Sequence, residues 1–317
     1  YIRKKYIIGF IVTSLFMGLQ ICANHPQMTY YLFLALGFLF LSELIRAATG
    51  KTPWKHFLIS SGVLGLALIL GVGMNSQRLL ANSEYVKETI RGKQILKSEH
   101  NSKDDDGMKK QEILNWSYGK LETLNLFIPR LLGGSSTEEV SDDFKKELRA
   151  SLESQTDDEE QIQAVFDQVA NGVPMYWGDQ PGTSGPAYQG AIVVFLAILG
   201  FFFAWKKYRY WILGASILTI LLAWGSNFLP LSDLFIDYVP LYNKFRAPSS
   251  ILVVVELLFP LIAIIGLYRF YNDEKLTEEY KQKILLYVGG SVLGITLLTG
   301  IYWYQIDFEK MFQVVSA

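Results

Sequence analysis

Two cations stand together in the segment 242–250 (YNKFRAPSS), where they could hold a phosphate group. Lys244 and Arg246 come directly before an apolar run, and Ser249 or Ser250 suits the N-cap of a helix that begins there. A guanidinium binds phosphate through paired hydrogen bonds, and the free N–H groups of a helix N-terminus add to such a site. The segment therefore predicts a lipid-phosphate site made by Arg246, Lys244 and Ser249. The alternative is that both cations only extend toward lipid head groups.

A second polar cluster occupies the turn 24–27, between two apolar runs. A tight turn there needs only Asn24 and Pro26, so His25 and Gln27 exceed the structural requirement. They are candidates for a binding site at the membrane surface. The alternative is that they hydrogen-bond a neighbouring loop.

Aromatic residues beside polar ones mark the segments 116–136 (WSYGKLETLNLFIPRLLGGSS) and 176–188 (YWGDQPGTSGPAY). Such aromatics can stack on sugar rings, but Trp and Tyr also favour the membrane–water interface, and composition favours the interface. The residues that would face a sugar or its acceptor are Tyr176, Trp177, Asn125 and Arg130.

Asp179 is the one candidate for a catalytic group, because a carboxylate can take the proton of an acceptor hydroxyl. A Gly-Asp-Gln-Pro turn accounts for the same residue without any chemistry.

Several chemistries have no motif in this chain. HExxH, CxxC, GxSxG and the phosphate-binding GxxxxGK[ST] loop are all absent. His25, His56 and His100 are dispersed, and His56 is expected on the opposite side of the membrane, so no metal site is predicted. Cys22 stands alone and cannot form an internal disulfide. The formal net charge of −1 argues against nucleic acid as a partner.

Seven apolar stretches, each read as long enough to cross a bilayer, organise the chain. Ionisable residues are nearly absent from them, with Glu43 and Glu256 as the exceptions. The stretches are 6–23, 28–45, 57–74, 189–205, 210–225, 251–268 and 284–303.

Basic residues in the short connections fall on one side of these stretches, which predicts a cytoplasmic N-terminus. The cytoplasmic group is Arg3, Lys4, Lys5, Arg46, Lys51, Lys55, Lys206, Lys207, Arg209, Arg269, Lys275, Lys281 and Lys283. The short segments on the opposite side, apart from the domain 75–188, hold only Lys244, Arg246 and, after the last stretch, Lys310.

We therefore expect an all-α polytopic membrane protein, with a mostly helical domain outside the membrane between the third and fourth spans. Two amphipathic helices, 140–153 and 158–170, are expected in that domain, each with acidic residues at its start. The predicted division is 1–74 (spans one to three), 75–188 (extracytoplasmic domain) and 189–317 (spans four to seven, with an outer loop at 226–250).

Four segments resemble the YfhO-like membrane proteins of bacteria, in particular their Bacteroidota branch. They are HPQMTYY at 25–31, the segment 116–136, YWGDQPGTSGP at 176–186 and LYNKFRAPSSIL at 241–252. The resemblance implies a glycosyltransferase of GT-C type in the bacterial inner membrane. Such an enzyme transfers a sugar from a polyprenyl-phosphate carrier, at the outer face, to a lipid, polymer or secreted protein.

Carried over by position, Arg246 and Lys244 would contact the carrier phosphate. His25 and Gln27 would line the donor or acceptor cavity, and Asp179 with Tyr176 and Trp177 would contact the acceptor or the sugar. The family places its catalytic acid in the first outer loop, and no such motif precedes the first apolar run here. We expect that acid, and a further span, upstream of Tyr1, and the family's size also predicts more chain after Ala317.

Three points stay open at this stage. GT-C enzymes often use a divalent cation, and the sequence does not decide whether this chain needs one. The missing acid and the acidic outer helices also suit a non-catalytic scaffold, or an accessory subunit of a membrane protein export complex. A transporter is less favoured, because it usually needs charges and broken spans at mid-depth.

Overall fold

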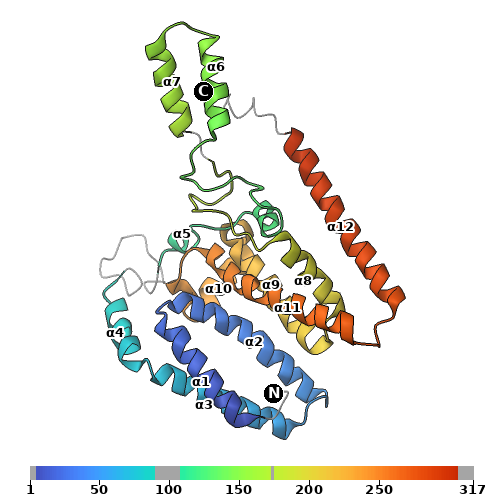
Figure 1. Cartoon of the computed structure of the whole chain (residues 1–317). Coiled ribbons are helices and arrows are strands. Elements are labelled where there is room, and N and C mark those ends of the chain that lie inside the picture. Colours follow the sequence, from blue (N-terminus) through green and yellow to red (C-terminus); the bar gives the residue numbers. More distant parts are fainter. Residues whose placement is uncertain (1–4, 90–107, 173–174, 306–317) are drawn as a thin grey trace.

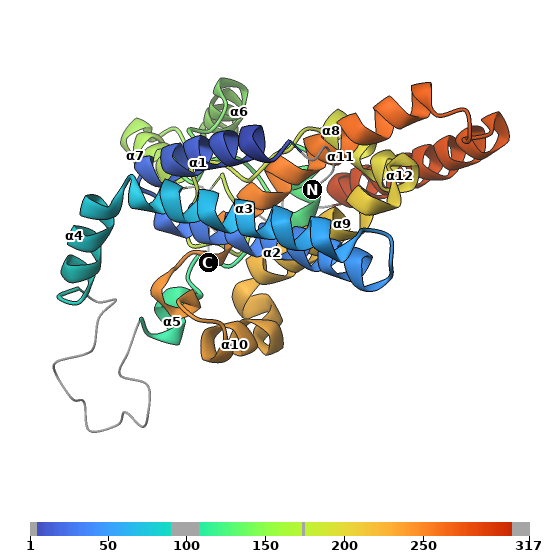
Figure 2. The same cartoon turned by 90° about the horizontal axis from the view of Figure 1, so that it is seen from below.

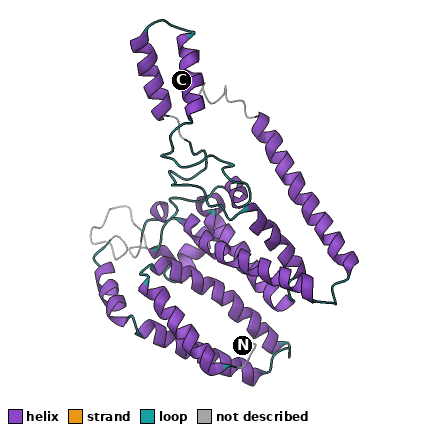
Figure 3. Ribbon diagram, in the orientation of Figure 1, coloured by secondary structure: helices purple, strands orange, loops and turns teal. Residues whose placement is uncertain are grey.

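The computed structural model describes residues 5–89, 108–172 and 175–305, and every regular element in these ranges is a helix (Figures 1 and 3). The extended backbone described there pairs once, in an isolated antiparallel bridge between Gly133 and Tyr176. The predicted all-α class is confirmed for the part of the chain that the structure describes.

Each of the seven apolar stretches forms a helix. The helices are α1 (Tyr6–Cys22), α2 (Pro26–Ala48), α3 (Trp54–Gly73), α8 (Ala191–Phe203), α9 (Lys206–Ala223), α11 (Val253–Asn272) and α12 (Glu278–Gln305).

Within the described ranges, four helices are long and apolar enough to cross a bilayer: α2, α3, α12 and α11 together with the short 3-10 helix η4 (Pro248–Leu252) before it. A fifth crossing results if α9 and the helical segment after it count as one bent span. The remaining two are shorter, α1 with 17 residues and α8 with 13. Length and composition thus support four or five of the seven expected spans.

The chain bends by 113° after α9, where the sequence analysis placed the end of the fifth span. Gly225 adopts φ +47°, and a side chain there would collide with Ser117 Oγ, so glycine is required. The 3-10 helix η2 (Gly225–Phe228) and then α10 (Leu229–Tyr238) follow directly. The segment 226–250, expected as an outer loop, is therefore largely helical.

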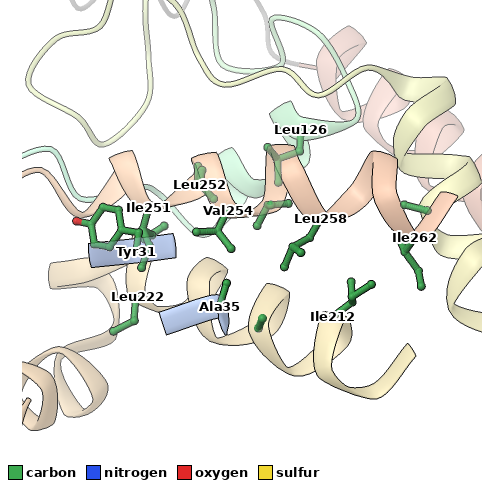
Figure 4. Packing of buried hydrophobic residues seen from close by; sticks show 14 of the residues in the cluster. Tyr31, Ala35, Leu126, Ile212, Leu222, Ile251, Leu252, Val254, Leu258 and Ile262 are labelled. Carbon is green, nitrogen blue, oxygen red and sulfur yellow. The ribbon is translucent and has the colours of Figure 1, made fainter. Parts of the chain in front are cut away.

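The main core lies between α2, α8, α9 and α11 (Figure 4). Tyr31 and Ala35 of α2 face Leu222 and Ile212 of α9, while Leu258 of α11 fills the space between the helices. The 3-10 helix η1 (Leu121–Leu126) inserts its last residue, Leu126, into the same cluster. The segment between α3 and α8 is thus joined to the helical core through η1.

Two glycines allow α8 and α11 to approach closely. A side chain on Gly200 would collide with the carbonyl oxygen of Ile262, and one on Gly266 would collide with the Cα of Gly200. Small residues at such a crossing bring the two backbones into van der Waals contact, which stabilises helix pairs in lipid.

The helices α1 and α3 pack on each other beside this core, next to α2 (Figure 2). Met17 and Gly18 of α1 pack against Gly71 and Met74 at the end of α3. The long α12 stands apart in Figure 1 and contacts α8 through Val288, which packs with Leu199 and Phe203.

The segment between α3 and α8 begins with α4 (Ser76–Val86) and continues, after the residues that the structure does not describe, with the one-turn helix α5 (Lys110–Ile113). Helices α6 (Asp142–Glu153) and α7 (Glu159–Gly172) then project away from the membrane-type helices as a hairpin (Figure 1). Both predicted amphipathic helices are confirmed. Ser141 caps α6 by accepting from Phe144 N at 3.2 Å, and the acidic residues at both helix starts are exposed to solvent.

Candidate functional site

The segment 116–127 is bound to the helical core, at the end of α9 and at the Arg246 loop, by backbone and side-chain hydrogen bonds. Tyr118 N donates to the carbonyl oxygen of Ala223 at 2.8 Å, and Ser226 N donates to Ser117 Oγ at 2.8 Å. Ser249 N donates to the carbonyl oxygen of Trp116 at 3.3 Å. These bonds place the segment between the end of α9 and the loop that carries Arg246.

A buried carboxylate lies at the centre of this junction. Glu122 is fully buried, and both of its carboxylate oxygens accept hydrogen bonds. Gly119 N donates to Oε2 at 2.5 Å, and the Tyr176 hydroxyl donates to Oε1, with Gln180 Nε2 at 3.4 Å from the same oxygen. Burying a carboxylate is costly unless it is hydrogen-bonded, so these donors account for its presence there.

Tyr176 is a predicted site residue that the structure assigns to this carboxylate. It is 7% exposed, and its backbone forms the bridge with Gly133. Burial and the hydrogen bond to Glu122 raise the pKa of Tyr176 above its ordinary value, so the hydroxyl keeps its proton and donates. Its ring is therefore not available for stacking on a sugar in this arrangement.

Asp179 lies beside the buried carboxylate and is itself exposed. A Cβ on Gly119 would lie 3.0 Å from Glu122 Oε2 and 2.9 Å from Asp179 Oδ2, so the two acids flank this glycine. Asn227 Nδ2 donates to Asp179 Oδ2 at 2.9 Å and to the carbonyl oxygen of Tyr118 at 3.1 Å. The result is one solvent-facing carboxylate held in place next to one buried carboxylate.

Asn125, another predicted site residue, is fully buried within the same segment. Its Oδ1 accepts from Leu132 N at 3.4 Å. Its Nδ2 and the adjacent Tyr118 hydroxyl lie near each other, yet neither atom reaches hydrogen-bond geometry with a protein group. Trp177 is half-buried, and its backbone N donates to the carbonyl oxygen of Leu132 at 2.9 Å.

Arg130 closes the turn that follows. It has φ +58°, and its Nη2 donates to Glu138 Oε1 at 2.8 Å, while Ser135 N donates to Glu138 Oε2 at 3.2 Å. The hydrogen bond from Arg130 lowers the pKa of the Glu138 carboxyl. The guanidinium therefore already has a carboxylate partner within the protein.

Gln27 connects the turn before α2 to the Arg246 loop. Its side-chain nitrogen lies 2.6 Å from the carbonyl oxygen of Arg246, 2.8 Å from Ser250 Oγ and 2.8 Å from the Tyr31 hydroxyl. Gln27 therefore hydrogen-bonds a neighbouring loop, as the alternative interpretation of the sequence predicted. His25 is exposed at the N-cap of α2, and no side-chain cap bond forms there.

The Arg246 loop differs from the expected helix start. The 3-10 helix η4 begins at Pro248, after Ala247 in a left-handed conformation with φ +58°. The prediction that Ser249 or Ser250 caps this helix is wrong. Ser250 Oγ donates to the carbonyl oxygen of Ala247 at 2.7 Å, and the backbone N–H groups of both serines already have partners.

A phosphate at this loop would therefore be bound by side chains rather than by free backbone N–H groups. Arg246 is exposed, and its guanidinium makes no hydrogen bond or ion pair within the described ranges. Lys244 is half-buried in the one-turn 3-10 helix η3 (Tyr242–Lys244). The two left-handed non-glycine residues of the loop, Leu241 and Ala247, each cost about 1 kcal/mol or more, so the surrounding contacts hold this shape.

The structure thus brings the predicted residues into two neighbouring groups. Tyr176 and Asp179 gather around Glu122, and Gln27 gathers with the Arg246 loop; the Trp116–Ser249 bond joins the two. Sequence reasoning missed Glu122 because a charged residue within a polar segment reads as exposed. The signal available was its place three residues after Gly119, where the carboxylate can accept from the glycine N–H.

Within the described part of the chain, no group of three or more His, Cys, Asp or Glu residues could hold a metal ion. Comparisons with protein-family models, with curated proteins and with solved structures find no match for this chain.

Proposed function

We propose that this chain is the core of a membrane glycosyltransferase of GT-C type, related to the YfhO-like proteins. It transfers a sugar from a polyprenyl-phosphate donor at the outer face of the bacterial inner membrane. In this proposal all seven apolar helices cross or enter the bilayer, the N-terminus of the chain is cytoplasmic, and the segment 75–188 is periplasmic.

The observation that carries the proposal is the position of Asp179 beside Glu122, joined through the segment 116–119 to the loop that presents Arg246. An exposed carboxylate can take a proton from an acceptor hydroxyl. An exposed guanidinium that has no partner among the described residues suits a carrier phosphate. Tyr176, Gln180 and Asn227 hold the acidic side in place, so they are positioning residues in this scheme.

The test is a transfer assay on membranes from cells that produce the natural full-length protein. The probes are polyprenyl monophosphates that each carry one radiolabelled hexose, and incorporation into extracted lipid, polymer and protein is counted. Arg246→Ala is expected to lower transfer more than 100-fold without changing the amount of inserted protein. Asp179→Asn is expected to lower kcat strongly and to change the KM for the donor only slightly.

Arg149→Ala provides the matched control. Arg149 pairs with Glu153 at 3.0 Å and with Glu159 at 2.5 Å on the α6–α7 hairpin, away from the junction. This variant removes the same charge and should transfer at the wild-type rate. Wild-type transfer by Arg246→Ala would refute the phosphate role, and wild-type kcat in Asp179→Asn would refute the proton-accepting role.

One observation favours a second function, that of a non-catalytic accessory subunit of a protein export complex. The α6–α7 hairpin projects from the body and carries exposed acidic residues at the starts of both helices (Figure 1). A partner protein could bind it. Purification from native membranes in mild detergent tests this role. The accessory role is favoured if a translocation channel is recovered in stoichiometric amount with the wild type and is lost when 140–172 is deleted. It also requires that neither protein shows sugar transfer.

A further inference from the structure

An open groove of about 560 Å³ lies between the C-terminal half of α2 and the N-terminal end of α9. One wall is apolar and consists of Phe38, Leu41 and Ile45 of α2. Tyr210 and Trp211 of α9 form the facing wall. These side chains would suit an acyl chain lying along the helices.

Four cations surround one end of this groove: Arg46, Lys51, Lys206 and Lys207. None of the residues that line the groove is acidic. Lys51 and Lys206 are exposed and make no ion pair with any described residue. Arg46 holds Glu43 through Nε at 3.4 Å, and Lys207 Nζ lies 4.7 Å from the centre of the Tyr208 ring.

Two features of α9 favour an anion at this end. Its first turn carries Lys206 and Lys207 but no acidic residue, and no side chain caps its N-terminus. Positive charge at a helix N-terminus opposes the helix dipole, so a bound anion would relieve it. Trp211 is 9% exposed and its Nε1 is buried, so this residue adds ring surface to the wall of the groove and no accessible donor.

We propose that this groove binds one anionic phospholipid. The phosphate lies among Lys206, Lys207, Lys51 and Arg46, and one acyl chain follows the apolar wall of α2 against the Tyr210 and Trp211 rings. An apolar wall beside a cationic rim fits a diacyl lipid rather than a free phosphate ion, and basic pockets between spanning helices recognise such head groups.

This site is separate from the proposed donor site. Gln27, which binds the Arg246 loop, and Arg46 lie at opposite ends of α2, roughly 28 Å apart at 1.5 Å per residue. The inference does not depend on the transferase proposal, because it rests on the groove, its apolar wall and its four cations.

The test uses the full chain purified in detergent and measured by native mass spectrometry, with dioleoyl phosphatidylglycerol, dioleoyl phosphatidylcholine or inorganic phosphate added. The wild type is expected to retain one phosphatidylglycerol molecule and to bind phosphatidylcholine at least tenfold more weakly. The double variant Lys206→Gln with Lys207→Gln should bind phosphatidylglycerol at least tenfold more weakly, since each cation near a lipid surface contributes about fivefold.

The matched control is Lys281→Gln with Lys283→Gln, which removes two charges from the start of α12 and should leave binding unchanged. The single variant Lys51→Gln removes one exposed cation from a different part of the rim, and should weaken binding about fivefold even if the double lysine variant does not fold. Equal retention by the Lys206/Lys207 variant and the wild type would overturn the proposal. The proposal would also be overturned if the α12 control lost phosphatidylglycerol to the same extent. It would likewise be overturned if inorganic phosphate bound as well as phosphatidylglycerol.

Discussion

Replacing Tyr176 by Phe isolates the contribution of one hydroxyl to the stability of the segment around Glu122. That hydroxyl donates to Glu122 and accepts from Gln180 N at 3.2 Å. A hydrogen bond to a charged group contributes about 1.5–3 kcal/mol, and a neutral one about 1 kcal/mol. Because Glu122 is fully buried and Tyr176 is 7% exposed, water does not replace the lost donor. We expect a local destabilisation of about 3 kcal/mol.

Hydrogen exchange of the protein in lipid nanodiscs measures this effect segment by segment. A local loss of about 3 kcal/mol corresponds to roughly 100-fold faster exchange for amides that exchange through local opening. The acceleration should be confined to the peptides that cover 116–127 and 175–182. The core of α9 and α11 should exchange as in the wild type.

Tyr188→Phe is the control, because it makes the same chemical change in the same segment. The Tyr188 hydroxyl accepts from Ala191 N at 3.1 Å, but Tyr188 is 49% exposed, so water can take its place. We expect less than a threefold change. Exchange of the 116–127 amides within threefold of wild type in Tyr176→Phe would refute the idea that this hydroxyl holds the buried carboxylate.

Three further outcomes follow from contacts described above. Gly266→Leu should lower the free energy of unfolding by about 2–3 kcal/mol, because the new side chain collides with the α8 backbone. The control is Gly290→Leu on α12, where an added Cβ meets no atom within 4 Å, and it should leave the melting temperature in detergent nearly unchanged. Gln27→Ala should lower the apparent unfolding free energy by about 2 kcal/mol through loss of its hydrogen bonds, and an unchanged melting temperature would contradict this. Arg130 lowers the pKa of Glu138, so the stabilisation from this pair is complete above pH 4.5, the ordinary pKa of the carboxyl, and is lost as the pH falls through the lower pKa of the folded state. Hydrogen-exchange protection of the 130–138 amides, corrected for the intrinsic rate, should therefore fall with acid in the wild type but not in Glu138→Gln.

The helices of this chain were largely predictable, because their signals are local. Long apolar runs give helices wherever backbone groups must satisfy one another. The starts of α6 and α7 were predicted within two residues from their periodicity and their acidic first turns. The length of α8 was not, since Gly190 at φ +99° and the extended Ala204 bound it at 13 residues.

The site was less predictable, because its contacts join residues far apart in the sequence. The partner of Glu122 is Tyr176, 54 positions later, and Gln27 meets Arg246 across 219 positions. The residue types predicted that Tyr176, Asp179 and Gln27 belong to a binding site. Only the fold shows that the Tyr176 hydroxyl donates a hydrogen bond to the Glu122 carboxylate. The serine cap failed because the 3-10 helix already begins at Pro248, with Ala247 as its N-cap, and the Ser250 hydroxyl donates back to the Ala247 carbonyl oxygen.

In the proposed arrangement, in which α8 lies in the bilayer, the shortness of this helix has a consequence for the lipid around it. A helix of 13 residues is about 20 Å long, about 10 Å less than the usual hydrocarbon thickness. This hydrophobic mismatch is relieved when lipids beside α8 compress, or when the polar chain leading into it lies below the general level of the head groups. Either adjustment brings the surface of the membrane toward the 176–190 segment. A head group diffusing in the plane would then reach Asp179 without being lifted out of its leaflet.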